Sequence, residues 1–336
     1  MQAQLIALDW GTTSLRAYKL AQGGRVLDQR ALSSGIMQLP RSTRVIAGQA
    51  CSDGFELAFD DACGDWLDAQ PELPVIACGM IGSAQGWREA AYRETPADVA
   101  TLGSSLQTVR TLRGTEVHIV PGVIQRSTLP NVMRGEETQV LGVLHSVADN
   151  APGDLLIGLP GSHSKWVQVA DGCIVHFDTF MTGEVFAVLS EHSILGRTQQ
   201  RSEGFDSHAF DRGVRVALST AGEAGPLSTI FSTRCLGLTG ELSAAAQPDY
   251  LSGLLIGHEL AALAAVQRRR RQAMALPAVL LIGNASLCAR YRRALQACGF
   301  PQVAEAEQAT ERGLWQLAVA AGLVPAAAIT SPSMEL

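Results

Sequence analysis

The stretch Asp9-Trp10-Gly11-Thr12-Thr13-Ser14-Leu15-Arg16 decides how the start of this chain folds. It follows Leu5-Ile6-Ala7-Leu8, a short apolar run that is typical of a buried strand. A partly alternating segment continues over 15–20, and Gln22-Gly23-Gly24 predicts a hairpin turn into another strand over 25–30. The Gly/Thr turn therefore joins two antiparallel strands. Walker loops and dinucleotide fingerprints open a helix instead, and neither motif occurs in the chain.

The residue types in this turn suit a phosphate-binding loop. Gly11 lets the backbone approach a ligand closely, and the Thr12 and Thr13 hydroxyls and the turn amides can donate to phosphate oxygens. Asp9, at the end of a buried strand, is placed to hold a divalent cation directly or through water. These residues alone leave an ordinary Asp/Gly/Thr hairpin turn equally open.

Length and composition bound the class of protein. The 336 residues predict two domains, and 47% hydrophobic with 17% charged residues is typical of a globular protein with a large core. The net charge of -6 argues against a nucleic-acid or polybasic membrane surface. We expect no signal peptide, because the first strand begins within five residues of Met1. The apolar region 251–266 contains His258 and Glu259, so we interpret it as a buried helix rather than a membrane span.

The seven cysteines indicate the compartment. They are odd in number, scattered, and lack CxxC spacing. This favours reduced core thiols in a cytoplasmic protein over a metal cage.

Two further segments of the first half carry candidate site residues. Val75-Ile76-Ala77-Cys78 predicts a buried strand, and the Gly-rich loop 79–89 follows it at the end where α/β proteins bind ligands. In this loop Trp87 could form an apolar wall for a sugar ring and Arg88 could bind a carboxylate, although a solvated loop with a packed Trp is the alternative.

A helix is predicted to begin near Gly135, with Arg134 just before it and Glu136 and Glu137 in its first turn. Either carboxylate could accept a proton from an attacking hydroxyl. The helix dipole favours carboxylates in a first turn in any protein, which is the structural alternative.

The opening pattern recurs in the second half, after a loose segment at 149–153 that we take as the domain boundary. Apolar 155–158 leads to the small-residue turn Leu159-Pro160-Gly161-Ser162-His163-Ser164, and Lys165 opens an alternating strand. A hairpin at 170–172 and a third strand over 173–177 complete the unit. This internal duplication, about 150 residues apart, is the most informative pattern in the sequence.

Later segments complete the second half. Asp178 precedes a predicted helix through Val185 and Leu195, and a long helix is expected over 249–266. The strand 278–282 leads through Gly283-Asn284-Ala285-Ser286 into a helix over 287–297. Gly283 allows close approach of a flat ligand, with a plain tight turn as the alternative. A last helix is expected over 310–321, followed by a tail from Pro325.

Each half thus reads as three antiparallel strands followed by alternating helices and strands. This resembles the duplicated ribonuclease-H-like α/β arrangement of the actin, Hsp70 and sugar-kinase superfamily, in which two domains face each other across an interdomain cleft. The resemblance implies an N-terminal domain over 1–150, a C-terminal domain over 151–310, and a C-terminal helix and tail over 311–336. The first turn resembles that superfamily's first phosphate loop and 161–165 the second, without the Asp that most members carry there. Residues 282–286 resemble its adenosine segment.

A group of longer motifs resembles one family, the 2-dehydro-3-deoxygalactonokinases. These motifs are spread over nearly the whole chain: Asp9-Trp10-Gly11-Thr12-Thr13, Gly79-Met80-Ile81-Gly82-Ser83, Met133-Arg134-Gly135-Glu136-Glu137-Thr138-Gln139, Leu159-Pro160-Gly161-Ser162-His163-Ser164-Lys165-Trp166, Phe180-Met181-Thr182-Gly183-Glu184 and Ser190-Glu191-His192-Ser193-Ile194-Leu195-Gly196-Arg197. One departure is Ser162, where the family pattern leads us to expect Thr. The hydroxyl is retained.

The resemblance implies an enzyme that uses ATP and Mg²⁺ to phosphorylate the 6-hydroxyl of 2-dehydro-3-deoxy-galactonate in galactonate breakdown. Its residue assignments are as follows: Asp9 for Mg²⁺; Gly11, Thr12, Thr13, Gly161, Ser162 and Lys165 for the phosphates; Gly283 and Asn284 for adenosine; Glu136 or Glu137 as the general base, with Asp178 in reserve; and Gln85, Trp87, Arg88 and Arg134 for the sugar acid.

Other functions remain open from the sequence. They are a kinase for a different sugar or sugar acid, a nucleotide-gated regulatory protein without phosphoryl transfer, and a phosphohydrolase on the same scaffold. Retention of Asp9 and two acidic candidates favours catalysis. We expect a small-molecule partner and no nucleic acid or membrane, and a homodimer is left open.

Overall fold

The computed structural model describes residues 2–148, 155–200 and 204–326, except for the side chains of 145–148 and 271. It divides into two compact units. Unit 1 comprises Met1–Asn150, Val169–His176 and Glu307–Leu336, and unit 2 comprises Ala151–Gln168 and Phe177–Ala306. The boundary expected at 149–153, and the tail expected at the C-terminus from residue 327 onward, lie outside the described residues.

Unit 1 is built on a mixed sheet whose strand order is β3-β2-β1-β6-β9-β8. Strand β1 pairs antiparallel with β2 and parallel with β6, and β6 pairs parallel with β9. The strands are β1 (Leu5–Trp10), β2 (Leu15–Ala21), β3 (Arg25–Leu32), β6 (Val75–Gly79), β8 (Gln107–Arg110) and β9 (Glu116–Ile119). The predicted hairpin at 22–24 is confirmed, and it forms the short helix η1 (Gln22–Gly24) between β2 and β3.

Smaller elements complete unit 1. The remaining strands are β4 (Arg44–Ile46), β5 (Gln49–Cys51), β7 (Arg93–Glu94), β10 (Val123–Gln125) and β11 (Asn131–Met133). The helices are α1 (Gly54–Ala69), η2 (Met80–Gly82), α2 (Val99–Gly103), α3 (Glu136–Ala148) and α10 (Ala309–Ala320). Helix α1 begins where Asp53 caps it, because that carboxylate accepts hydrogen bonds from the backbone N–H groups of Phe55 and Glu56.

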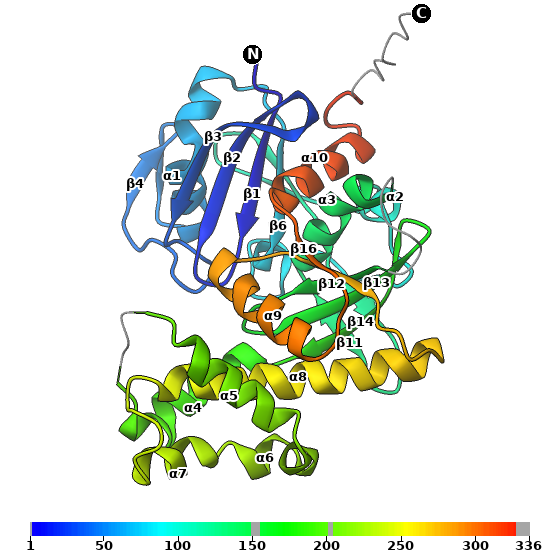
Figure 1. Cartoon of the computed structure of the whole chain (residues 1–336). Helices are drawn as coiled ribbons and strands as arrows, with labels where there is room; N and C mark the ends of the chain where they lie inside the picture. The colour runs from blue at the N-terminus through cyan, green and yellow to red at the C-terminus, as the bar shows by residue number, and fades with distance from the viewer. Residues whose placement is uncertain (1, 149–154, 201–203, 327–336) are drawn as a thin grey trace, which may run out of the picture. The chain divides into compact units, whose positions relative to one another are not determined.

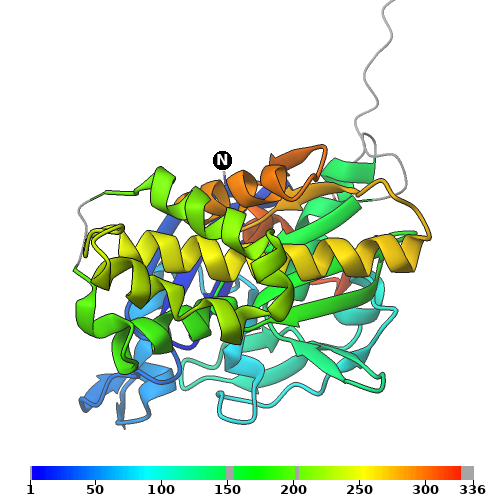
Figure 2. The same cartoon turned by 60° about the horizontal axis from the view of Figure 1, so that its bottom comes forward.

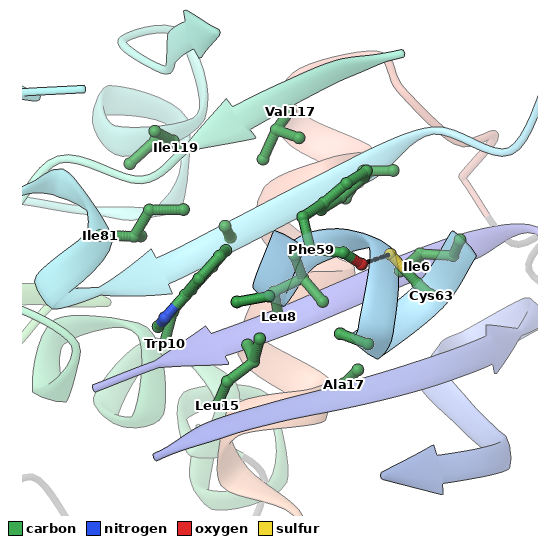
Figure 3. Close-up of a cluster of buried hydrophobic side chains, with 14 of the residues drawn as sticks. Ile6, Leu8, Trp10, Leu15, Ala17, Phe59, Cys63, Ile81, Val117 and Ile119 are labelled. Carbon is green, nitrogen blue, oxygen red and sulfur yellow. Dashed lines mark hydrogen bonds between the residues drawn. The ribbon is translucent and has the colours of Figure 1, made fainter. Parts of the chain in front are cut away.

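The core of unit 1 lies between its sheet and α1. Alternate residues of β1, namely Ile6, Leu8 and Trp10, point to the same face because side chains alternate along a strand, and all three are fully buried. Figure 3 shows them together with Phe59 and Cys63 of α1. Each large apolar side chain buried in this way contributes about 1.5–3 kcal/mol. This packing therefore fixes the register of β1, and with it the position of the end of β1 that leads into the Gly/Thr turn.

Helix α10, near the end of the chain, packs on α3 within unit 1 (Figure 1). Their backbones touch, since a Cβ on Gly142 would lie 2.0 Å from the Ala309 oxygen and one on Gly313 would lie 2.0 Å from the Thr138 oxygen. The amide of Gln139 also donates to the Thr310 hydroxyl at 3.0 Å. The helix that begins with the two predicted glutamates is therefore supported by the end of the chain.

Unit 2 repeats the same arrangement with the strand order β14-β13-β12-β15-β16. Strand β12 pairs antiparallel with β13 and parallel with β15, which pairs parallel with β16. The strands are β12 (Leu155–Leu159), β13 (Ser164–Ala170), β14 (Cys173–Phe180), β15 (Ala278–Leu281) and β16 (Val303–Glu305). The hairpin end of β13 and β14, Val169–His176, is counted with unit 1. The duplicated ribonuclease-H-like α/β fold expected from the sequence is confirmed.

The helices of unit 2 gather around α8, the long yellow helix of Figure 2. They are α4 (Thr182–His192), η3 (Gly196–Thr198), α5 (Ser207–Ala217), η4 (Thr220–Ala224), α6 (Pro226–Thr229), α7 (Ser232–Leu238), α8 (Gln247–Arg271) and α9 (Ala285–Ala297). Within the described residues, α8 is the one helix long and apolar enough to cross a membrane, but most of it is buried inside the protein. The prediction that 251–266 is a buried helix is confirmed.

Candidate functional site

The Gly/Thr turn between β1 and β2 is held by the segment that follows β3. The Gly11 N–H donates to the Ser14 oxygen at 2.9 Å, and the N–H groups of Ile36 and Met37 donate to the oxygens of Gly11 and Thr12, both at 3.0 Å. Thr12 and Thr13 are exposed. The backbone of the turn is thus fixed while its two hydroxyls face solvent, as a phosphate loop requires.

Asp9 lies one residue before the end of β1. Its side chain is 20% exposed, and the Arg16 guanidinium on β2 approaches its carboxylate at 3.3 Å. Burial raises the pKa of Asp9, and Arg16 opposes that rise. A carboxylate with one weakly held cation beside a hydroxyl-bearing turn is a suitable ligand for Mg²⁺.

The ends of β1, β6 and α3 converge within unit 1. Gly79, with φ +92°, has no room for a Cβ because the Trp10 oxygen would lie 2.8 Å from it. A Cβ on Gly135, with φ +112°, would lie 3.3 Å from the Gly79 Cα. These two glycines let the start of α3 approach the strand ends closely.

The buried thiol of Cys78 lies opposite Asp9 in the pairing of β1 with β6 and directly precedes Gly79, which Gly135 approaches. Burial raises its pKa well above the ordinary value for a thiol, and the charges of Asp9, Glu137 and Glu136 raise it further. The charges of the three acidic residues predicted for metal binding and proton transfer therefore all act on one thiol.

The two adjacent glutamates have different surroundings. Glu137 is fully buried, and the Gly135 N–H donates to its two carboxylate oxygens at 2.9 and 2.8 Å. Burial, and to a lesser extent the charge of Glu136, raises the pKa of Glu137 to about 8. Glu136 is partly exposed and accepts a hydrogen bond from the Arg134 N–H at 3.1 Å. Only Glu136 of the pair is placed to meet a bound ligand.

Of the loop residues predicted to bind the sugar acid, two are exposed to solvent and one packs against the core. Gln85 and Arg88 are exposed. Trp87 is partly buried, and its ring stacks on Phe55 with centroids 5.8 Å apart and contacts Trp10. Trp87 thus packs against the core of unit 1, as the structural alternative held.

Arg134 links the loop after β6 to the start of α3. Its Nη2 donates to the Ala90 oxygen at 2.9 Å, and its guanidinium carbon lies 4.3 Å from the centroid of the Tyr92 ring. Its Nε and Nη1 are buried without a hydrogen-bond partner in the described structure. The side chain fixes the loop that carries the sugar-acid candidates.

In unit 2 the second turn packs directly against the start of α4. The Glu184 N–H donates to the Ser162 oxygen at 3.0 Å, and a Cβ on Gly183 would lie 2.4 Å from the Gly161 oxygen. The Glu184 carboxylate is hydrogen bonded to the His163 ring. Ser162 is exposed at the N-terminus of a helix, where partial positive charge favours anions.

Lys165 and Asp178 are both engaged within unit 2. Lys165 is buried, and its Nζ donates to the Thr179 hydroxyl at 3.0 Å. Both carboxylate oxygens of Asp178 accept from Arg270, at 2.5 and 2.9 Å. The reserve candidate for the base is thus held in a bidentate ion pair.

The predicted adenosine segment forms the turn between β15 and α9. Gly283 has φ +154°, and a Cβ there would lie 3.4 Å from the Pro160 oxygen, beside the second turn. Asn284 caps α9, and its side chain accepts from the N–H groups of Ser286 and Leu287. The amide of Asn284 is thus used to begin the helix.

A cavity of about 740 Å³ opens in unit 2 beside the second turn. Gly161 and Ser162 of the turn, Thr182 and Gly183 of α4, and residues of α8 and α9 line it. On its α8–α9 wall, Arg290 pairs with Asp249 at 2.6 Å and lies 4.3 Å from the centroid of the Phe205 ring. A volume of this size is typical of sites for small molecules and cofactors.

Several supporting residues were not expected from the sequence. They are the residues 34–37 that back the first turn, Cys78 opposite Asp9, and Asp249 and Arg290 in the cavity wall. The apolar strand before Cys78 was the only signal for it, and an ion pair between two helices has no sequence signature. Within the described residues there is no cluster of three or more His, Cys, Asp or Glu side chains that could hold a metal alone.

Comparisons with known proteins identify the family. Residues 9–317 match the sequence model of the 2-keto-3-deoxy-galactonokinase family. The chain is 34% identical over 310 residues to a probable 2-dehydro-3-deoxygalactonokinase of Rhizobium meliloti (strain 1021), covering 92% of this chain and 94% of the relative. It is also 34% identical over 301 residues to the 2-dehydro-3-deoxygalactonokinase of Escherichia coli (strain K12), covering 89% and 91%.

A solved structure agrees. A crystal structure from Sinorhizobium meliloti, provisionally assigned as a 2-dehydro-3-deoxygalactonokinase, superposes with a TM-score of 0.79 at 34% identity, covering 94% of this chain and 98% of that one. The family resemblance and the fold inferred from the sequence are both confirmed. The chain belongs to the 2-keto-3-deoxy-galactonokinase family.

Proposed function

We propose that this protein transfers the γ-phosphoryl group of ATP to the 6-hydroxyl of 2-dehydro-3-deoxy-galactonate. The hydroxyl oxygen forms a bond to the γ-phosphorus, the bond to the ADP oxygen breaks, and the hydroxyl proton passes to a carboxylate. The products are the 6-phosphorylated sugar acid and ADP. Such transfer depends on positioning and charge neutralisation more than on covalent chemistry.

One observation carries the proposal. In a chain of this kinase family, Asp9 lies opposite Cys78 in the pairing of β1 with β6, and Gly135 at the start of α3, just before Glu136 and Glu137, approaches Gly79 at the end of β6. The turn after Asp9 carries two exposed threonine hydroxyls. This combines an acceptor for a proton, a ligand for a cation, and donors for phosphate in one unit. A regulatory protein without phosphoryl transfer has no need of the proton acceptor.

We assign the general base to Glu136. Its carboxylate is partly exposed at the N-terminus of α3, whereas Glu137 is fully buried and accepts hydrogen bonds from the Gly135 N–H. A base must come within hydrogen-bond reach of the proton that it accepts. Glu137 then holds the helix start that presents Glu136.

The residues around Asp9 fit a magnesium ion. Mg²⁺ in phosphoryl-transfer sites is held by one or two carboxylates together with phosphate oxygens and water. A single, partly exposed carboxylate therefore suffices. Asp9 would hold it, and the ion would neutralise charge on the ATP phosphates.

The nucleotide is assigned to unit 2. Its phosphates would meet the turn of Gly161 and Ser162 and the N-terminus of α4, and its base and ribose would enter the cavity of about 740 Å³. Thr12 and Thr13 of unit 1 are the proposed donors from the first turn. Gln85, Arg88 and Arg134 are the proposed contacts of the sugar acid.

The test is ADP release with ATP and Mg²⁺, with 2-dehydro-3-deoxy-galactonate, its gluconate epimer, and simple hexoses as acceptors. We expect release with the galactonate acid and much less with the epimer. Equal rates for both acids would indicate a sugar-acid kinase of looser specificity, and hexose activity alone would refute the proposed substrate. ADP release without any acceptor would indicate a phosphohydrolase.

The inactive control is Asp9→Asn. The Asn side chain keeps the size of Asp but loses the charge, so we expect turnover to be abolished with an unchanged circular dichroism spectrum. If Asp9→Asn retained full turnover, the assignment of Asp9 to the cation would be wrong.

A further inference from the structure

A buried carboxylate on α8 has no role in the reaction described above. Glu259 is 3% exposed and lies in the middle of the helix. Burying a carboxylate is costly unless hydrogen bonds or a cation compensate it. Trp166 Nε1 donates to Oε1 and the Tyr291 hydroxyl donates to Oε2, both at 2.7 Å. Burial raises the pKa of Glu259, and the side chains of Thr182, Trp166, Tyr291 and Ser164 oppose that rise. All four of these side chains are neutral.

The four side chains come from the segments that form the proposed nucleotide site. Ser164 and Trp166 open β13 directly after the second turn, and Ser164 also lies 2.8 Å from the Tyr291 hydroxyl. Thr182 is the first residue of α4, next to Gly183, which touches Gly161 of the turn. Thr182 and Tyr291 line the cavity themselves. One carboxylate therefore connects the strand that follows the turn to α9, and Tyr291 of α9 lines the same cavity as the first residue of α4.

We propose that Glu259 is a positioning residue for ATP, which sets the second turn and the start of α4 at the spacing that the phosphates require. This inference rests on the proposed function of the unit 2 cavity. A carboxyl group can accept hydrogen bonds at both of its oxygens, and a network of buried bonds fixes the groups that it joins. Misplacing phosphate-binding groups by a fraction of an ångström weakens binding without unfolding the protein.

The sharpest variant is Glu259→Gln, which keeps the shape of the side chain and removes its charge. In this variant an amide N–H₂ group, which is a donor, replaces one carboxylate oxygen, which is an acceptor. This group then faces other donors, so the network must rearrange. We expect the KM for ATP to rise about tenfold or more and the KM for the sugar acid to stay within about twofold. The rise in Tm that ATP produces in the wild-type enzyme should shrink in parallel. A second variant, Tyr291→Phe, removes one donor and should change the same two quantities in the same direction by less.

The matched control is Gln267→Met. Gln267 is also buried on α8 and also hydrogen bonds to β13, but to Gln168, four residues beyond Ser164. We expect both KM values to stay within about twofold of wild type in this variant. It separates the loss of any polar contact between α8 and β13 from the loss of the contact near the turn.

The outcomes are distinguishable. An ATP KM within about twofold of wild type in folded Glu259→Gln overturns the inference, as does an equal rise in both KM values. If Glu259→Gln does not fold, Tyr291→Phe decides by the same criteria. A wild-type enzyme that neither releases ADP nor gains Tm from ATP overturns the proposed function and this inference with it. A normal wild type with unaffected variants overturns this inference alone.

Discussion

At the residue scale, the site shows how one helix turn can give two identical side chains opposite properties. Glu136 and Glu137 are adjacent, yet one is partly exposed and the other is enclosed by the start of α3. The helix dipole favours the ionised form of both, but full burial outweighs it for Glu137, whose pKa rises to about 8. The sequence predicted both glutamates as candidates and left the choice open, because burial depends on Gly79 and Gly135, which bring the helix to the strands.

The first prediction concerns the base. Glu136→Gln removes the proposed proton acceptor, so we expect kcat to fall by about 10²–10⁴-fold while ATP binding is unchanged. The steady-state rate at saturating ATP and the Kd for ATP measure the two effects separately. The matched variant Glu137→Gln should lose less activity, because this side chain does not reach a ligand. A normal rate in Glu136→Gln would remove that residue from the mechanism.

The second prediction concerns pH and Glu137. Its pKa is about 8 in the folded protein and near 4.5 when unfolded, so the folded state holds a proton that the unfolded state releases between these values. The stability that Glu137 contributes is therefore fully present below about pH 4.5 and is lost as pH rises through about 8.

Urea unfolding from pH 5 to 9 tests this. The decline in the free energy of unfolding should be steeper in wild type than in Glu137→Gln, which has no titrating group at this position. Asp9, whose pKa is also raised, is the same in both proteins, so it does not contribute to the difference between them. The exposed Glu116→Gln serves as a control and should follow wild type. Parallel curves for wild type and Glu137→Gln would contradict the raised pKa.

At the element scale, backbone contacts at a glycine decide how closely the second turn approaches α4. Gly183 touches the backbone of Gly161 and Ser162, so the helix N-terminus and the turn form one surface. The prediction is that Gly183→Ala forces them apart, because its Cβ would lie 2.4 Å from the Gly161 oxygen. We expect the KM for ATP to rise and stability to fall by about 1–3 kcal/mol.

Kinetics and urea unfolding measure the two effects of Gly183→Ala. The control is Ala187→Leu, which adds bulk at an exposed position on the same helix and should change neither quantity appreciably. Unchanged ATP kinetics in Gly183→Ala would mean that the start of α4 takes no part in binding the phosphates.

The same scale shows what sequence patterns can predict. Strong periodicity predicted β1, β6, α3 and α8, because burial on one or both faces leaves a regular apolar pattern. It gave no warning of the short helices between Thr220 and Leu238 or of the small sheet of β7, β10 and β11. Those elements have two to seven residues, too few for a period to show, and their stability comes from the neighbours on which they pack.

At the scale of the whole molecule, the sequence predicted the duplication but did not predict that the last helix packs on unit 1. The two sheets share the order of an antiparallel pair joined to parallel strands, as the repeated strand–turn–strand pattern indicated. The last helix, however, belongs to unit 1, although it follows the strands of unit 2 in the chain. Its amphipathic pattern predicts a helix but does not say which surface it covers.

The final prediction tests the packing of the last helix on unit 1. Helix α10 packs on α3 through Gly142 and Gly313, and the backbones meet so closely that a Cβ on Gly313 would lie 2.0 Å from the Thr138 oxygen. Gly313→Val must push α10 away, exposing apolar surface of unit 1 and loosening the helix that carries Glu136. We expect a loss of about 1–3 kcal/mol in the free energy of unfolding together with a lower kcat. The neighbouring Arg312→Val adds the same side chain at an exposed position and should leave both quantities near wild type. If Gly313→Val matched Arg312→Val in urea unfolding and rate, α10 would not support α3, the helix of the proposed base.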